Sequence, residues 1–135
     1  MDILTVDMET YYDKDFSLSK MQTDAYVLDK RFEVIGVSVI RENENDAEWF
    51  SGTEEETLHW LWANFDWANS AVRCHNTLFD GFIMTQRFGI RPKLWMDTLA
   101  QGRMLLPYLP SHSLANLSKH YKLPDKGTQV ANYIG

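Results

Sequence analysis

The chain has 135 residues, a mass of 15.8 kDa and a formal net charge of −6. This length suits one domain, and a composition of 44% hydrophobic and 13% aromatic residues excludes a disordered chain and predicts a packed core. Apolar stretches such as Val34 to Ile40 are too short to cross a membrane, and no secretory signal is expected after Met1. The single cysteine, Cys74, excludes an internal disulfide and fits a reducing compartment.

Charge is unevenly distributed along the chain. Residues 1–70 hold 16 acidic and 5 basic side chains, whereas residues 71–135 hold 3 acidic and 8 basic ones. The overall acidity argues against a protein that simply coats nucleic acid, but the second half can face a polyanion. Seven carboxylates from Glu42 to Glu56 are best explained by a solvated hairpin followed by the start of a helix.

The first half of the chain predicts three strands and a helix. Residues Asp2 to Glu9 alternate like a strand, and the polar segment from Tyr11 to Asp29 has no clear period. Arg31 to Ile40 is dense in β-branched residues, as in a central strand, and we expect it to form a hairpin with a short strand from Ala47 to Phe50. A helix capped by Ser51 or Thr53 is expected to run to about Trp67.

The second half predicts two strands that alternate with helices. The expected strands are Ser70 to Cys74 and Lys93 to Met96. The expected helices run from Leu78 to Arg87, ended by Gly89, from Asp97 or Thr98 to Leu106, and from Ser111 or Ser113 to about Tyr121. This order predicts a single α/β domain whose sheet mixes antiparallel and parallel pairs.

Two acidic side chains share one face of the first strand. Asp7 and Glu9 are two residues apart, so both project to the same side while Met8 points to the other. Adjacent carboxylates repel each other unless a cation lies between them, which is a first indication of a metal site. Taken alone, the pattern D-x-E is explained more simply by a half-exposed strand with a polar outer face.

A second acidic motif begins where a strand ends, at Asn76 to Asp80 (N-T-L-F-D). Ligands of open α/β sheets collect at this position. Taken alone, Asp80 is explained more simply as a first-turn acid favoured by the helix dipole. The combination of D-x-E on the first strand with N-x-x-F-D at a strand-to-helix junction is far more specific than either motif.

This combination resembles the first two exonuclease motifs of the DnaQ-like, DEDD-type 3′–5′ exonucleases. The closer resemblance is to the N-terminal proofreading domain of the family A (polymerase I-type) DNA polymerases of bacteriophages. The matching segments are Asp7 to Thr10, His75 to Asp80, Trp95 to Leu99 and Ser113 to Leu117. The resemblance covers nearly the whole chain.

The resemblance implies a fold, a cofactor and a substrate. The fold is an RNase H-like mixed sheet of about five strands flanked by helices, without its last helix. Two Mg²⁺ or Mn²⁺ ions would be held by Asp7, Glu9 and Asp80, one activating water and the other stabilising the leaving 3′ oxygen. The implied partners are a single-stranded DNA 3′ end and a downstream polymerase domain, with no membrane, in the cytoplasm of the host cell if the protein is phage-encoded. The residues expected to contact substrate are Thr10, His75, Asn76 and Phe79.

One acid of the family pattern has no convincing match. The third motif is Y-x-x-x-D or H-x-x-x-D on a last helix, and beyond Asp97 the chain offers only Asp125, four residues after Tyr121. Pro124 disfavours helical geometry at Leu123, so this fit is best explained as accidental. We therefore expect residues 1–135 to be a C-terminally truncated exonuclease domain with weak or absent activity on its own.

Two other functions remain open from the sequence. The first is a non-catalytic, nucleic-acid-binding or structural module that keeps an RNase H-like scaffold. The second is an RNase H-like nuclease that cuts RNA or internal sites, which the N-x-x-F-D motif disfavours.

Several further residues have a structural explanation as well as a functional one. Asp97 is expected to cap the helix that follows it rather than to join the acidic site. The tryptophans Trp60, Trp62 and Trp67 fit a core or a docking face better than a base-stacking surface. The basic residues that can neutralise phosphates are Arg73, Arg87, Arg91, Lys93 and Arg103.

Overall fold

The computed structural model describes residues 1–124 and contains a five-stranded mixed sheet with flanking helices, as the sequence predicts. The strands are β1 (Asp2–Thr10), β2 (Val34–Arg41), β3 (Glu48–Phe50), β4 (Ser70–Cys74) and β5 (Leu94–Asp97). The helices are α1 (Thr23–Leu28), α2 (Glu54–Asn64), the 3₁₀ turn η1 (Trp67–Asn69), α3 (Thr77–Phe88), α4 (Thr98–Leu105) and α5 (Leu114–His120). No helix in residues 1–124 is long and apolar enough to cross a membrane.

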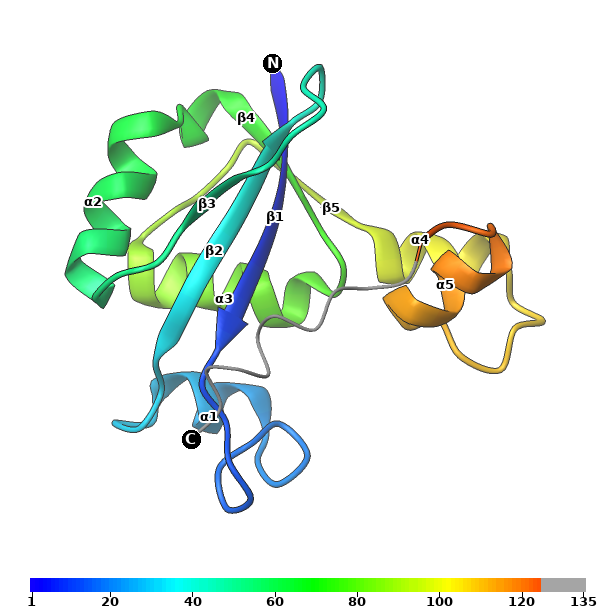
Figure 1. The fold of residues 1–135 in the computed structure, drawn as a ribbon, viewed down its shortest axis with the longest axis horizontal. Coiled ribbons are helices and arrows are strands. Elements are labelled where there is room, and N and C mark those ends of the chain that lie inside the picture. Colours follow the sequence, from blue (N-terminus) through cyan, green and yellow to red (C-terminus); the bar gives the residue numbers. More distant parts are fainter. Residues whose placement is uncertain (125–135) are drawn as a thin grey trace.

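The sheet has the order β3-β2-β1-β4-β5, with β1 at its centre. β1 and β2 are antiparallel, and β2 forms the predicted hairpin with β3. β1 and β4 are parallel, but their pairing ends where Thr5 lies opposite Arg73, so β1 extends well beyond it. β4 and β5 are also parallel, and their last pair is Cys74 with Asp97. The C-terminal ends of β1, β4 and β5 therefore point in the same direction (Figure 1).

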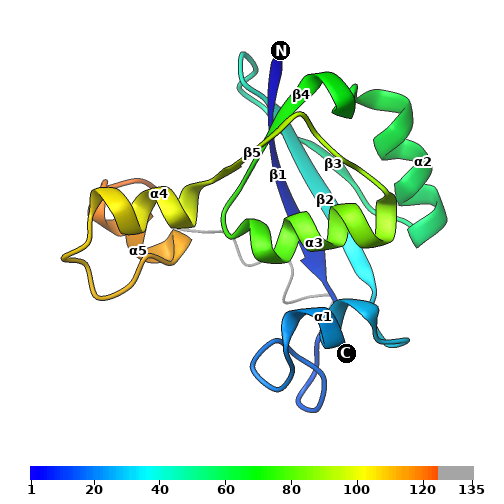
Figure 2. The same ribbon diagram turned by 180° about the vertical axis from the view of Figure 1, so that it is seen from behind.

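The core lies between the sheet and α3, which crosses the strands on one face (Figures 1 and 2). Alternation along β1 buries Leu4, Val6 and Met8, because every second side chain of a strand points to the same face. Ile83 and Met84 of α3 are fully buried against this face. Together these contacts fix α3, and with it the residues of its first turn, relative to β1.

Local sequence explains where the helices begin and end. Thr53 and Glu56 form a reciprocal capping box at the start of α2, Asp97 caps α4 and Ser113 caps α5. Gly89 ends α3 in the left-handed conformation at φ 65°, which a glycine adopts without a steric penalty.

Three sequence expectations differ from the structure. The strand expected to begin at Arg31 begins at Val34, because the backbone N–H groups of Arg31 and Phe32 are held in a turn by hydrogen bonds to Asp29. The helix expected over residues 51–67 ends at Asn64, and Trp67 begins the turn η1, where its buried indole N–H donates to the Leu61 carbonyl. The segment without a clear period contains α1, whose six residues are too few to show a helical period.

Candidate functional site

Asp7 and Glu9 lie near the C-terminal end of β1, on the face opposite to the core. Asp7 is exposed and pairs across the sheet with Ser38, whereas Glu9 is half-buried and pairs with Gly36. Met8, between them, is buried on the core side. The strand therefore places both carboxylates on one surface, as the D-x-E spacing predicts.

Asp80 approaches the same part of β1 from the first turn of α3. Its side chain is only 4% exposed, and its Oδ1 accepts a hydrogen bond from the backbone N–H of Met8 at 3.2 Å. This contact is possible because β1 continues beyond the point where its pairing with β4 ends. This hydrogen bond joins Asp80, of the second acidic motif, to Met8, which lies between Asp7 and Glu9 of the first motif.

The surroundings of Asp80 disfavour its negative charge. Burial is the largest cause and the charge of Asp7 the next, with a smaller contribution from Glu9, and together they raise the pKa of Asp80 to about 8. The hydrogen bond from Met8 opposes this rise without cancelling it. A cation bound near these three carboxyl groups would offset both the repulsion and the loss of solvation.

The donor chemistry of these residues fits a hard divalent cation, because all three side chains offer carboxylate oxygens. Within residues 1–124, however, no group of three or more His, Cys, Asp or Glu side chains is gathered closely enough to hold a metal ion as it stands. Asp125, the formal match to the third motif, lies outside the described residues. The predicted ligand set is therefore suitable by residue type, while its assembly around an ion stays a prediction.

Asp97 joins the beginnings of two helices, and its predicted capping role is confirmed. Its Oδ1 accepts the backbone N–H of Leu99 at 2.9 Å in α4 and that of Asn76 at 2.9 Å at the start of α3. Its Oδ2 accepts the backbone N–H and the hydroxyl of Thr77, both at 3.1 Å. Burial acts to raise the pKa of Asp97, but these donors outweigh it and the pKa is lowered.

Asn76 stands in the left-handed conformation, with φ 78° and ψ 78°, immediately before α3. Asparagine is enriched in this conformation, which most residues with a Cβ avoid. Its side chain makes no capping hydrogen bond, although Asn76 occupies the N-cap position. The residue therefore turns the chain from β4 into α3 through its backbone, and its predicted contact with substrate stays a prediction.

His75 connects the end of β4 to the region of α4 and α5. Its Nδ1 lies 2.8 Å from the hydroxyl of Thr98, and its Nε2 lies 2.8 Å from the backbone carbonyl oxygen of His112. Because both ring nitrogens are hydrogen-bonded within the protein, His75 has a clear structural role, and a substrate contact would compete with these bonds.

Thr10 is held by a tyrosine that sequence reasoning did not single out. The hydroxyl of Tyr26 donates to the Tyr11 carbonyl oxygen at 2.6 Å and lies 3.0 Å from Thr10 Oγ1. Since the Tyr26 proton is used at Tyr11, Thr10 is the donor of the second bond. The Phe79 ring, half-buried, lies 6.2 Å from the Tyr26 ring. Two predicted substrate residues, Thr10 and Phe79, thus meet around Tyr26.

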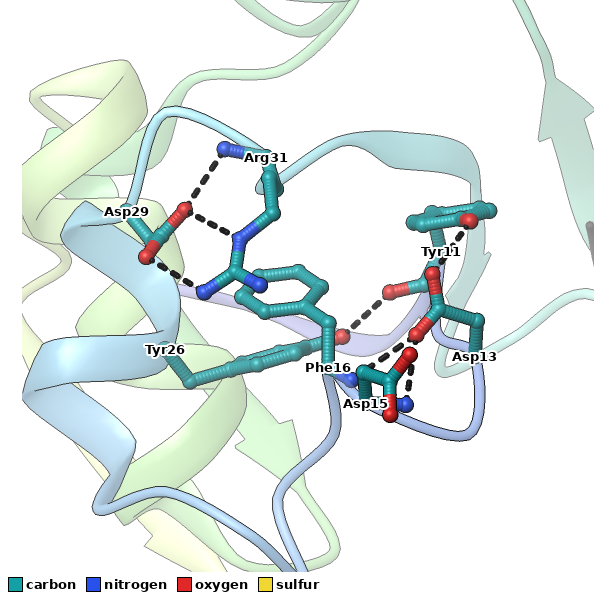
Figure 3. Close-up of polar contacts among 7 residues, drawn as sticks. All are labelled: Tyr11, Asp13, Asp15, Phe16, Tyr26, Asp29 and Arg31. Atoms are coloured by element: carbon teal, nitrogen blue, oxygen red, sulfur yellow. Dashed lines mark hydrogen bonds and ion pairs between the residues drawn. The ribbon is translucent and has the colours of Figure 1, made fainter.

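Tyr26 belongs to a packed cluster that supports the end of β1 (Figure 3). The Phe16 ring stacks on Tyr26 with centroids 4.6 Å apart, and the guanidinium of Arg31 lies 4.5 Å from the Phe16 ring centre. Arg31 also binds Asp29 through two side-chain hydrogen bonds of 3.0 Å, which hold the pKa of Asp29 at about 2. Nothing in the spacing of residues 11–29 shows this cluster, because it depends on the stacking of Phe16, in the loop before α1, on Tyr26 of α1.

Two of the five predicted phosphate-binding residues are engaged in ion pairs. Arg73 donates to Glu42 and to the Thr5 hydroxyl, both at 2.9 Å, and Arg87 Nε lies 2.8 Å from Glu54. Arg91 and Lys93 are exposed in the connection between α3 and β5, at the opposite end of β5 from α4 and Asp97, so their position does not favour the predicted phosphate-binding role beside the carboxylates. Arg103 is exposed on α4.

No family model matches the chain, and no curated protein matches it. Several solved structures, however, are similar to the chain. NrnC of Brucella melitensis with bound Mg²⁺ is similar with a TM-score of 0.64 and 16% identity over 96% of this chain and 58% of that chain. A structure described as the apo form of the nuclease is similar with a TM-score of 0.63 and 17% sequence identity, over 95% of this chain and 56% of that chain. A further structure of Brucella melitensis NrnC has a TM-score of 0.63 and 14% sequence identity, over 93% of this chain and 56% of that chain.

The chain spans 56% to 58% of the length of these structures. At such identities the likeness establishes the fold. The mixed five-stranded sheet with flanking helices matches the overall fold of these nuclease structures, and it is the α/β, RNase H-like fold that the motifs predict.

Proposed function

We propose that the chain is a metal-dependent 3′–5′ exonuclease domain of the proofreading type, which hydrolyses phosphodiesters at single-stranded DNA 3′ ends and whose activity is weakened because the third-motif acid has no convincing match. Its motifs resemble those of bacteriophage family A DNA polymerases, and in such a protein a polymerase domain would follow it. The fold shared with nucleases supports a nuclease in general. The preference for DNA and the proofreading context come from the motif resemblance.

The observation that carries the proposal is the placement of Asp80. A buried carboxylate rests on the backbone of Met8, between the exposed Asp7 and the half-buried Glu9. Burying an acid beside two other acids costs free energy, and neither the core nor the helix start requires it. Such an arrangement is typical of a functional site.

Asp7, Glu9 and Asp80 are the residues that would hold divalent cations, which supply a lowered pKa for the attacking water and charge stabilisation at the leaving oxygen. The chain's own contribution is positioning. β1 fixes Asp7 and Glu9 on one face, and α3 holds Asp80 through the Met8 N–H. The cluster around Tyr26 fixes the backbone that follows Glu9.

The test is cleavage of a 5′-labelled DNA oligonucleotide with a free 3′ end in the presence of Mn²⁺. We expect slow shortening of the oligonucleotide from its 3′ end, because the third acid of the family pattern has no convincing match in residues 1–135, and we expect even this activity to be lost in Asp7→Asn. Asp2→Asn is the matched control, because Asp2 is an exposed acid at the other end of the same strand. A circular single strand is expected to stay intact, since an exonuclease needs an end.

Other outcomes separate the alternatives. Cutting of the circular strand or a preference for RNA of the same sequence would favour another RNase H-like nuclease. Activity that survives both Asp7→Asn and Asp80→Asn would contradict the proposed site. Binding of the oligonucleotide without any Asp7-dependent cleavage would favour the non-catalytic module.

A further inference from the structure

We propose that the lobe formed by α4, α5 and their flanking loops, residues 98–124, is a binding surface for single-stranded nucleic acid. The inference rests on the proposed function in one respect, because it assigns the surface that would hold the strand leading to the carboxylate site. Figure 1 shows α4 and α5 standing beyond the end of β5, to one side of the sheet.

The charge of this lobe differs from that of the rest of the chain. Residues 98–124 contain no Asp or Glu, although the whole chain has 19 acids against 13 bases. They contain Arg103, Lys119 and Lys122, all exposed, together with His112 and His120. A surface with cations and no carboxylates attracts a phosphate backbone, and here it lies beside an otherwise acidic protein.

Aromatic rings accompany the cations. Tyr108 is 70% exposed and Tyr121 is 57% exposed. The His120 ring lies close to both, with its centre 6.3 Å from that of Tyr108 and 4.9 Å from that of Tyr121. Rings exposed beside cations suit stacking with unpaired bases, which single strands offer and duplexes do not.

A hollow of about 230 Å³ lies beside these rings. It is lined by the loop 109–111 and by Asn116, Lys119 and His120 of α5. Lys119 supplies a charge, while Ser111 and Asn116 supply neutral hydrogen-bonding groups. Among residues 1–124, the lining therefore offers several groups suited to a phosphate and contains no carboxylate that would repel one.

The lobe is joined directly to the candidate site. His75 binds the hydroxyl of Thr98 and the carbonyl oxygen of His112, and Asp97 binds the starts of both α4 and α3. A strand lying on the lobe is thereby placed next to the first turn of α3, which carries Asp80. Exposed Met104 and Leu105 on α4 can also suit a protein partner, but the charge and the exposed rings favour nucleic acid.

The experiment measures binding of a fluorescent oligothymidylate by anisotropy, with EDTA present so that no cleavage occurs. The double variant Arg103→Gln/Lys119→Gln is compared with Arg91→Gln/Lys93→Gln, which removes the same number of exposed cations from the opposite end of β5. We measure the slope of log binding constant against log NaCl concentration between about 50 and 200 mM. Arg103→Gln/Lys119→Gln, the lobe pair, should reduce the steepness of this slope by about 1.4 and the affinity by roughly tenfold, whereas Arg91→Gln/Lys93→Gln, the control pair, should change neither. Tyr108→Ala should weaken binding several-fold while leaving the slope unchanged.

The result does not depend on the catalytic site. Equal losses in the two double variants, or no binding by the unmodified chain, would overturn the inference. If the Arg103→Gln/Lys119→Gln variant binds the oligonucleotide as wild type does, while wild type shows Asp7-dependent exonuclease activity, the proposed function would stand and the proposed binding surface would be wrong. Self-association lost in Met104→Ser/Leu105→Ser, together with unchanged oligonucleotide binding in the lobe pair, would assign the surface to a protein and also overturn the inference.

Discussion

Asp80 combines burial, two acidic neighbours and a hydrogen bond from Met8 in one side chain. Without a cation, the folded protein must either keep a buried negative charge or take up a proton, and in the unfolded chain this carboxyl group is solvated and ionised at neutral pH. The placement of Asp80 therefore reduces the stability of the metal-free protein, and such a loss of stability is common at functional sites.

We predict that Asp80→Asn stabilises the metal-free protein. The amide keeps an oxygen for the Met8 N–H and removes the charge, so we expect a gain of about 1–3 kcal/mol, equivalent to roughly 3–10 °C in Tm, in EDTA at neutral pH. The measurement is thermal unfolding of the variant beside wild type and Asp2→Asn. A lower Tm for Asp80→Asn than for wild type would show that the carboxylate supports the fold instead.

Asp97 has the opposite electrostatic character. Its folded pKa is lowered by donors from Asn76, Thr77 and Leu99 despite its burial. Because the pKa of Asp97 is lower in the folded than in the unfolded protein, its charge stabilises the fold at any pH above the unfolded pKa of about 4. This stabilisation is lost as the pH falls through the folded pKa. We predict that Asp97→Asn costs about 1–2 kcal/mol at neutral pH.

The check is urea unfolding of both proteins across acidic and neutral pH. The difference between wild type and Asp97→Asn should be constant near neutrality and should shrink below about pH 4. A difference that does not change on acidification would mean that the charge of Asp97 makes no contribution.

At the scale of elements, the junction between β4 and α3 determines where Asp80 lies. Asn76 makes this junction with φ 78°, and α3 then packs against β1 through buried Ile83 and Met84. We predict that Asn76→Ala destabilises the protein by about 1 kcal/mol, because alanine is strained in the left-handed conformation, and that Asn76→Gly does not.

The same pair of variants separates the two roles of Asn76. If the side chain contacts substrate, as the motif predicts, Asn76→Gly should raise the KM for an oligonucleotide while its Tm matches wild type. Wild-type KM in Asn76→Gly would restrict the residue to its backbone role, and equal Tm values for the glycine and alanine variants would contradict the strain.

Sequence reasoning succeeded for elements whose information is local. Alternation located β1, β-branched density located β2, and Thr53, Asp97 and Gly89 marked helix ends. It failed at α1, because a helix of six residues in a polar segment has no readable period. The cluster of Phe16, Tyr26 and Arg31 could not be predicted from spacing either, because it depends on ring stacking between segments that are apart in the sequence.

For the candidate site, the sequence indicated the acids but not how they meet. Spacing alone puts Asp7 and Glu9 on one face, but the contact between Asp80 and Met8 depends on how far β4 pairs with β1. The ion pairs of Arg73 and Arg87 likewise depend on tertiary neighbours, so their predicted phosphate-binding roles could not be weighed from charge counts.

At the scale of the whole molecule, the charge asymmetry of the sequence becomes a spatial arrangement. The acidic first half supplies β1 with Asp7 and Glu9, and the second half supplies Asp80 together with an acid-free lobe at the end of β5. A polyanion held on the lobe would lie beside carboxylates that need cations to accept it. The fold is shared with solved nuclease structures, and we propose that this neighbouring pair of surfaces carries the function.

The central claim is that Asp7, Glu9 and Asp80 together bind divalent cations. Calorimetric titration with Mn²⁺ tests it without a substrate, using wild type, Asp7→Asn, Asp80→Asn and the control Asp2→Asn. The account predicts that wild type and Asp2→Asn bind Mn²⁺ alike, and that binding is lost or strongly weakened in the other two. Equal Mn²⁺ binding by all four proteins, or binding by none of them, would contradict it.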